Sequence, residues 1–177
     1  HRDLHSFPTR RSSDLWAKSL SYAESIFIIA EKLCVPVKMA ADYGVNILLE
    51  PHGPITDSIQ GILDVMDRLG NPESLGVNLD TGNSWLGGAD PVEMARVFRD
   101  KIHHVHWKDL GEEWLPKRGH EYGCGFSTIA LGDGLIDIKG VCDALKGADI
   151  PYSTLEIVGS PDILIKSRAY LESCGIS

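Results

Sequence analysis

The segment Val77-Asn78-Leu79-Asp80 alternates apolar and polar side chains and ends in a carboxylate. Three more segments share this form and also end in a residue that can bind a metal ion: residues 46–50, 104–106 and 154–156. Alternation with a period of two predicts strands on which the polar side chains share one face. Core strands rarely carry such a face, so we expect these strands to surround a polar interior.

Helical patterns separate the strands. In the first half we expect helix 16–34, a helix resumed at 37–43 after Pro36, strand 45–50, helix 59–69, strand 75–80 and a loop from residue 81. In the second half we expect a helix starting at Asp90-Pro91, strand 102–107, a long loop 108–131, a weak helix 137–148, strand 152–158 and helix 161–173. Strands that alternate with helices predict a parallel sheet with right-handed crossovers. The predicted fold class is therefore α/β, the C-terminal half of a (β/α)8 TIM barrel with four βα units, because 177 residues are too few for a whole barrel of about 250.

The beginning of the chain differs from the rest. Residues 1–15 are rich in Ser and Arg, lack periodicity, and from His5 to Leu15 closely resemble a translated sequencing adapter. We expect an artefactual or disordered segment at 1–15 and a partial barrel domain at 16–177. On this interpretation the chain is an inactive C-terminal fragment that exposes two sheet edges, and we expect it to associate or aggregate.

Composition restricts the partners. The formal net charge of -8 argues against nucleic acid and anionic membranes, since both favour clusters of Lys and Arg. The four cysteines lack metal-binding or disulfide spacing, and no signal peptide or apolar run of about 18 residues is present, so we expect a cytoplasmic protein. A small sugar is the expected partner. A homo-oligomer of the full-length protein is left open.

The polar strand ends are expected to converge. Glu50, Asp80, His106 and Glu156 each lie at the carboxyl end of a strand, the rim where barrel enzymes build active sites. Burying three unpaired carboxylates together is costly without a cation. The oxygen-rich set predicts one divalent ion, Mn²⁺, Mg²⁺ or Co²⁺, in preference to a structural zinc ion.

Further candidates line the same rim. His104 is expected to bind substrate or brace the ligands, with a structural packing role as the alternative. Lys108 is expected to steady an enediolate or a phosphate, unless it is a solvated rim residue. His52 is a candidate substrate contact in a Pro-flanked loop, and Arg118 is a candidate lid residue in the long loop. The triplet Gly132-Asp133-Gly134 is interpreted as a turn.

The same candidate residues lie in segments that resemble a known family. Segments 45–53, 76–83, 104–109, 132–137 and 154–157 resemble the sugar phosphate isomerase/epimerase family of xylose isomerase-like barrels, and the resemblance runs from about residue 17 to the end. It implies that Glu50, Asp80, His106 and Glu156 are metal ligands and that Glu50 and Glu156 also transfer protons. Many members have His where this chain has Asn83, which we keep as a substrate-binding candidate. Ketose 3-epimerases have Arg where this chain has Glu112.

The predicted function is a divalent-metal-dependent isomerase or epimerase of a sugar or sugar phosphate. It acts through an enediolate, with Glu50 and Glu156 as the proton-transfer pair. A metal-dependent dehydratase or lyase on a keto-sugar or keto-inositol is the first alternative, because an enediolate can also expel a leaving group. A non-catalytic binding module is the second. The acidic balance and the shortage of His argue against a DNA-repair endonuclease with a zinc cluster.

Overall fold

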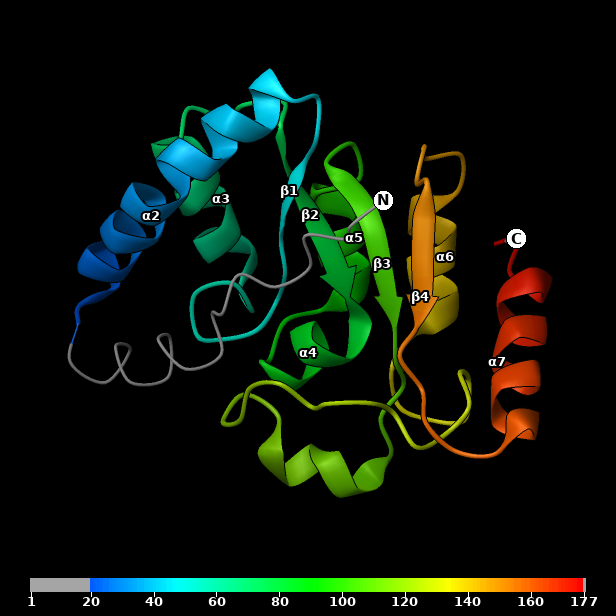
Figure 1. Cartoon of the computed structure of the whole chain (residues 1–177). Helices are drawn as coiled ribbons and strands as arrows, with labels where there is room; N and C mark the ends of the chain where they lie inside the picture. Colours follow the sequence, from blue (N-terminus) through cyan, green and yellow to red (C-terminus); the bar gives the residue numbers. More distant parts are fainter. Residues whose placement is uncertain (1–19, 177) are drawn as a thin grey trace.

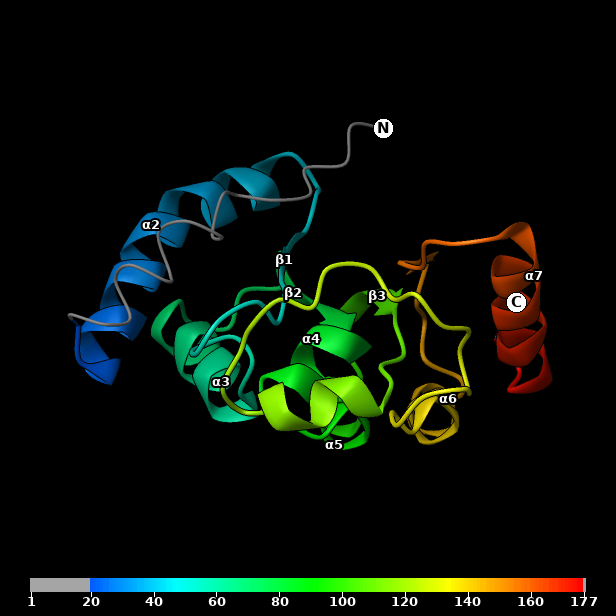
Figure 2. The same ribbon diagram turned by 90° about the horizontal axis from the view of Figure 1, so that it is seen from below.

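A computed structural model describes residues 20–176, which form a four-stranded parallel sheet with the order β1-β2-β3-β4 (Figure 1). The strands are β1 (Ile47–Leu49), β2 (Leu75–Asp80), β3 (Ile102–Trp107) and β4 (Tyr152–Leu155). Seen from their carboxyl ends, the helices form an arc outside the curved sheet (Figure 2). The predicted α/β half-barrel is confirmed, whereas the interpretation of residues 1–15 lies outside the described residues.

The first described helix is α2 (Tyr22–Asp42), which begins with a complete capping box. Ser21 Oγ accepts from the Glu24 amide at 3.3 Å, and Glu24 Oε2 accepts from the Ser21 amide at 2.8 Å. The predicted interruption at Pro36 is wrong, because the helix continues through it. Proline removes one backbone hydrogen bond, but burial of Val37 just beyond it favours continuation.

Three more helices lie along the sheet, α3 (Ile59–Arg68), α5 (Pro91–Val97) and α6 (Ile138–Leu145), and a fourth, α7 (Pro161–Ser173), lies beside β4. Two shorter ones, α4 (Thr81–Leu86) and the 3-10 helix η1 (Glu112–Lys117), lie beyond the carboxyl ends of the strands (Figure 1). The predicted loop after β2 is therefore wrong, since α4 starts directly at the strand end. Among the described helices, none is long and apolar enough to cross a membrane.

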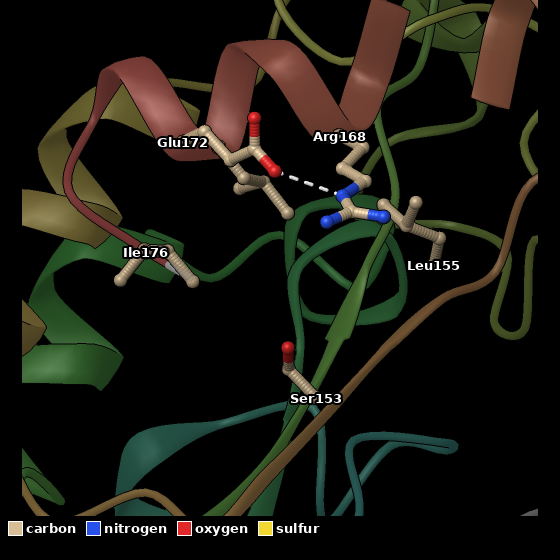
Figure 3. A pocket seen from close by; sticks show the side chains of 6 residues that line it. Ser153, Leu155, Arg168, Glu172 and Ile176 are labelled. Atoms are coloured by element: carbon tan, nitrogen blue, oxygen red, sulfur yellow. Dashed lines mark hydrogen bonds and ion pairs between the residues drawn. The ribbon is translucent and has the colours of Figure 1, made fainter. Parts of the chain in front are cut away.

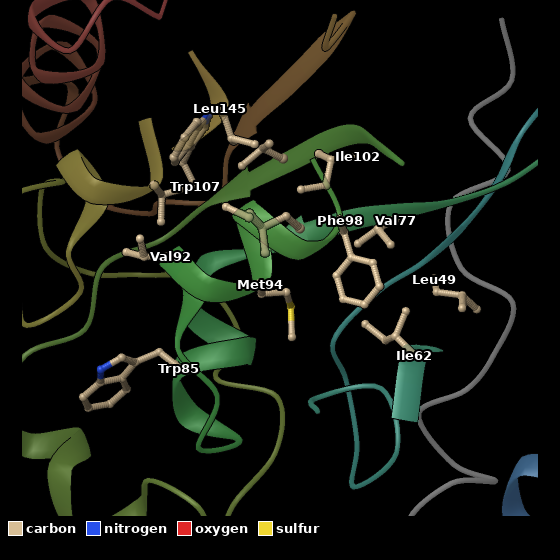
Figure 4. Close-up of a cluster of buried hydrophobic side chains, with 14 of the residues drawn as sticks. Leu49, Ile62, Val77, Trp85, Val92, Met94, Phe98, Ile102, Trp107 and Leu145 are labelled. Carbon is tan, nitrogen blue, oxygen red and sulfur yellow. The ribbon is translucent and has the colours of Figure 1, made fainter. Parts of the chain in front are cut away.

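The apolar face of the sheet packs against the helices. Leu49, Val77, Val105 and Trp107 are buried there together with residues from α3, α5 and α6 (Figure 4). The opposite face of β2 and β3 carries the buried polar side chains of Asn78, Asp80, His104 and His106. Burial of apolar area stabilises the first face by about 25 cal/mol per Å². The buried polar side chains of the opposite face need hydrogen bonds and charge pairing to offset the cost of their burial.

The long loop 108–131 crosses the carboxyl end of the sheet (Figure 2). It is attached to α4 by the Gly119 amide, which donates to Leu86 O at 2.6 Å. It is attached to the chain beyond β4 by Ser127, whose amide donates to Glu156 O at 2.9 Å and whose carbonyl accepts from the Val158 amide at 2.8 Å. Residues 156–158, the last three of the predicted strand 152–158, therefore lie outside β4. They bond to the long loop through an isolated bridge between Ile157 and Ser127.

β1 and β4 are the outer strands of the sheet among the described residues. Tyr152 on β4 is 66 % exposed. Beside β4, α7 stands away from the sheet over a groove of about 140 Å³, lined by Ser153, Leu155, Arg168, Leu171, Glu172 and Ile176 (Figure 3). An outer strand in this setting presents unpaired backbone groups that favour pairing with another chain.

We expect the chain to associate in a concentration-dependent manner, as measured by analytical ultracentrifugation. Tyr152→Lys places a charge on the outer strand and should raise the concentration needed for association by roughly tenfold. Val97→Lys changes a half-exposed residue on α5 and should leave association unchanged. A monomer at every concentration, with a cooperative melt, would contradict this expectation.

Candidate metal centre

The side chains of the four predicted ligands meet in one cluster. His106 Nδ1 lies 3.3 Å from Glu156 Oε1, 3.5 Å from Glu50 Oε1 and 3.8 Å from Asp80 Oδ2. The ligand atoms of Glu50, Asp80 and His106 all lie within 4.8 Å of one another. Four separate segments of the sequence therefore converge at one end of the sheet.

Strand register produces this convergence. Asp80 and His106 are direct partners across β2 and β3. Glu50 and Glu156 immediately follow β1 and β4. Asp80 is fully buried, whereas the side chains of Glu50 and Glu156 are 33 % and 22 % exposed. The cluster is thus closed on the side of β2 and more open on the sides of the two glutamates.

The distances from His106 Nδ1 to the three carboxylates suit ligands that share one divalent ion. Two ligand atoms bound at about 2.1 Å from one ion lie at most about 4.2 Å apart. The three contacts of His106 Nδ1, at 3.3 to 3.8 Å, fall within that limit. Three carboxylates and one imidazole form a donor set that suits divalent cations.

Lys108 is part of the same cluster. It is 2 % exposed, so the alternative of a solvated rim lysine is wrong. Its Nζ lies 2.8 Å from Asp80 Oδ2 and 2.6 Å from Glu156 Oε2. Burial disfavours the ammonium, but the charge of Asp80 outweighs it and raises the pKa of Lys108. A positive charge therefore lies between two of the candidate ligands.

The surrounding carboxylates also favour a positive charge at His106, which is a proton until a metal ion takes its place. Burial lowers its pKa, but the hydrogen bonds to Asp80 and Glu50 and the charges of Glu50 and Glu156 outweigh burial and raise the pKa to about 9. For Asp80, burial acts to raise the pKa, and His106 and Lys108 lower it overall. The carboxylates and the two cations of the cluster thus stabilise one another's charges.

Asn83, a predicted substrate contact, donates two hydrogen bonds to the carboxylate of Asp80. Its backbone amide and its Nδ2 each donate to a carboxylate oxygen of Asp80 at 2.8 Å. Its Oδ1 accepts from the amide of Cys124 at 3.0 Å and lies 3.2 Å from the Cys124 sulfur. The structure therefore places Asn83, which is 1 % exposed, in contact with protein groups at both ends of its side chain.

His104 contacts the ligand histidine directly. Its ring meets the His106 ring edge to face, with centroids 4.8 Å apart and planes at 81°. Its Nε2 lies 2.9 Å from Thr154 Oγ1 on the neighbouring strand. This geometry favours the bracing role among the roles predicted for His104.

The two remaining candidates lie in loops around the cluster. The His52 ring packs against Gly123, where an added Cβ would lie 2.5 Å from its Cε1. Arg118 is not brought to the ligands: its Nε donates to Trp85 O at 3.0 Å, and its Nη2 donates to Ala89 O at 3.1 Å. Its guanidinium also lies 5.0 Å from the centroid of the Trp85 ring. Arg118 thus fastens the long loop to α4.

Sequence reasoning missed three residues near the cluster. Thr81 Oγ1 donates to Lys108 O at 2.7 Å and accepts from the Lys108 amide at 2.9 Å, which joins the ends of β2 and β3. Cys124 reaches Asn83 from the long loop. Asp57, 2 % exposed, has no hydrogen-bond partner at either carboxylate oxygen among the described residues. The sequence carries no spacing signal for any of the three.

These features define a class: a parallel half-barrel with a carboxylate-rich metal centre at the carboxyl ends of its strands. The family described as xylose isomerase-like TIM barrel matches residues 10–174. The chain belongs to this family.

Two curated relatives cover most of the chain. An inosose dehydratase of Geobacillus thermodenitrificans is 29 % identical over 157 residues, which are 78 % of this chain and 51 % of the relative. A 3-dehydroshikimate dehydratase of Bacillus anthracis is 32 % identical over 136 residues, 72 % of this chain and 48 % of the relative. The chain thus spans about half the length of these relatives.

Solved structures share the fold. The probable 3-DHS dehydratase AsbF of Bacillus anthracis superposes with a TM-score of 0.70 at 23 % identity, over 88 % of this chain and 59 % of that one. The IOLI protein, solved with a binding zinc atom, gives 0.69 at 18 % identity, over 88 % of this chain and 58 % of that one.

Asp57 makes stability depend on pH. Burial raises its pKa from 3.8 to about 8, and the nearby charges of Asp80 and Glu50 act in the same direction. Between these values the folded chain holds a proton that the unfolded chain has released, so stability falls as pH rises through this window. Asp57→Asn stays neutral and should remove a loss of roughly 3 to 4 kcal/mol between pH 5 and 8.

Urea unfolding at both pH values measures this effect. The control Asp67→Asn changes an exposed carboxylate of α3 and should keep the pH dependence of the unchanged chain. An Asp57→Asn variant with that same pH dependence would show that Asp57 is ionised throughout.

Proposed function

We propose that the protein carrying this chain is a metal-dependent dehydratase that removes water from a polyhydroxylated ketone, such as a keto-sugar or keto-inositol. The observation that carries the proposal is the cluster in which three carboxylates surround His106 and two of them also contact the Lys108 ammonium. The dehydratases among the relatives support it, and they favour the reaction that sequence analysis placed second. Because the chain spans about half of their length, the activity is proposed for the whole protein.

Dehydration of a hydroxylated ketone requires two bonds to break. A C–H bond next to the carbonyl loses its proton to a base, and its electron pair becomes the new C=C bond. The C–O bond one carbon further on breaks, and the hydroxide leaves as water once it has accepted a proton. The site must therefore provide a base, an acid and stabilisation of negative charge on the carbonyl oxygen.

The cluster contains each of these groups. Glu50, Asp80, His106 and Glu156 would hold a divalent ion, which when bound polarises the carbonyl oxygen and stabilises charge that develops there. Glu156, on the more open side, is the proposed base. Lys108 carries its proton 2.6 Å from Glu156 Oε2 and is the proposed donor to the departing hydroxyl.

Epimerisation or isomerisation is the second candidate, and one observation favours it. Glu50 and Glu156 come from the two outermost strands and approach His106 Nδ1 at 3.5 and 3.3 Å. A sugar bound between them would lose a proton to one carboxylate and regain it from the other. Epimerisation therefore begins with the same loss of a proton as dehydration, but the proton is returned and the product stays saturated.

The full-length protein, incubated with Mn²⁺ and polyhydroxylated ketones, should generate ultraviolet absorbance from an enone. Glu156→Gln removes the base and should lower the rate by at least about 100-fold. Glu172→Gln, on the surface of α7, should leave the rate unchanged. Deuterium uptake from solvent into recovered ketose without enone absorbance would support the epimerase and contradict the dehydratase.

Metal content separates an enzyme of this type from a binding module. We expect about one divalent ion per chain by elemental analysis, because the carboxylate cluster needs a cation. Asp80→Asn removes a buried ligand charge and should weaken Mn²⁺ binding by at least about tenfold. Asp67→Asn serves again as the exposed control. A chain that binds no divalent ion would refute the proposed metal chemistry.

A further inference from the structure

The loop segment 118–127 runs along the metal centre and is attached at three points. Gly119 and Arg118 bond to carbonyls at the end of α4. Ser127 bonds to the backbone on both sides of Ile157, including the carbonyl of Glu156. Between these ends, Cys124 contacts Asn83. We call this segment the strap.

Within residues 20–176, the middle attachment is the one whose side-chain hydrogen bonds lead to a ligand carboxylate. Asn83 Nδ2 donates to Asp80 Oδ2, the oxygen that also faces Lys108 Nζ and His106 Nδ1. Asn83 Oδ1 accepts from the Cys124 amide of the strap. The two ends of a single amide group thus join the strap to the most buried ligand.

The geometry allows little freedom at this junction. Asn83 is 1 % exposed and Cys124 is 7 % exposed. An added Cβ on neighbouring Gly82 would lie 2.9 Å from the Cys124 sulfur and 2.8 Å from Lys108 Cβ. Because the groups are closely packed, a shift of the strap must move Asn83 or break its bond.

We propose that Asn83 is a positioning residue that couples the strap to the metal centre through Asp80. The proposal rests on the proposed metal chemistry and goes beyond it, since it concerns how the hydrogen bonds of Asn83 to Asp80 and Cys124 link the strap to the site. Thermodynamic linkage then makes the coupling reciprocal: if strap attachment strengthens ion binding, ion binding strengthens strap attachment by the same factor. Both directions are measurable without any catalytic assay.

The first measurement uses Mn²⁺ affinity, determined by calorimetric titration. Asn83→Ala removes the donor to Asp80 and the acceptor for the strap, and should weaken Mn²⁺ binding by roughly tenfold or more, as expected for a group that orients a ligand. Ser84→Ala is the matched control, because Ser84 is equally buried in α4 but donates to the backbone carbonyl of Asp80 at 2.6 Å. It should change affinity by less than about twofold.

The second measurement is hydrogen exchange in peptides covering 118–127, with Mn²⁺ or with a chelator. In the unchanged chain, Mn²⁺ should slow exchange of the strap by roughly tenfold, and this readout remains valid if Asn83→Ala fails to fold. In Asn83→Ala the effect of Mn²⁺ on the strap should disappear, whereas Ser84→Ala should retain it.

The outcomes distinguish the two proposals. If the unchanged chain binds no Mn²⁺, the proposed metal chemistry fails. If it binds Mn²⁺ but strap exchange is unaffected, or if Asn83→Ala binds Mn²⁺ as tightly as the unchanged chain, the positioning role of Asn83 is overturned while the metal chemistry stands.

Discussion

Three carboxylates, from Glu50, Asp80 and Glu156, approach one another at the carboxyl end of the sheet, and their mutual repulsion constrains everything around them. Burying such a group without compensating positive charge is costly. In the described structure Lys108 and His106 supply that charge. The polar face of the sheet is therefore a requirement of the site, and the apolar core is confined to the opposite face.

Asp80 shows how closely fold and site are combined. Its backbone ends β2, its Oδ1 caps α4 by accepting from the Asn83 amide, and its Oδ2 faces Lys108 and His106. A capping carboxylate stabilises a helix start, so the ligand is oriented by the same bond that initiates the next element. The orientation of this ligand thus depends on local chain geometry rather than on long side chains that adjust freely.

The sequence was sufficient for the existence of the four strands and for the convergence of their polar ends, because both follow from simple periodicity. Strands 75–80 and 102–107 have the predicted bounds, whereas His106 lies opposite Asp80 because a register shift between Val77 and Asn78 skips one residue of β3. It was insufficient where tertiary contacts override local preference. Thr81-Gly82-Asn83 has turn composition, yet burial and the Asp80 cap make it helical, and Asn83 binds protein groups because loop 108–131, distant in sequence, reaches it.

Dehydration and epimerisation share their first step, so the ligand set alone does not choose between them. Both need a base beside the carbonyl and stabilisation of the resulting negative charge. Only dehydration needs an acid for a departing hydroxyl, whereas epimerisation needs a second group on the opposite face of the same carbon. In the proposed reactions Lys108, which contacts Glu156, would serve the first need, and Glu50, which approaches His106 from β1, would serve the second. The outcome therefore depends on how the substrate is oriented between these two sides, which is a property of the loops that border the cluster rather than of the metal ligands themselves.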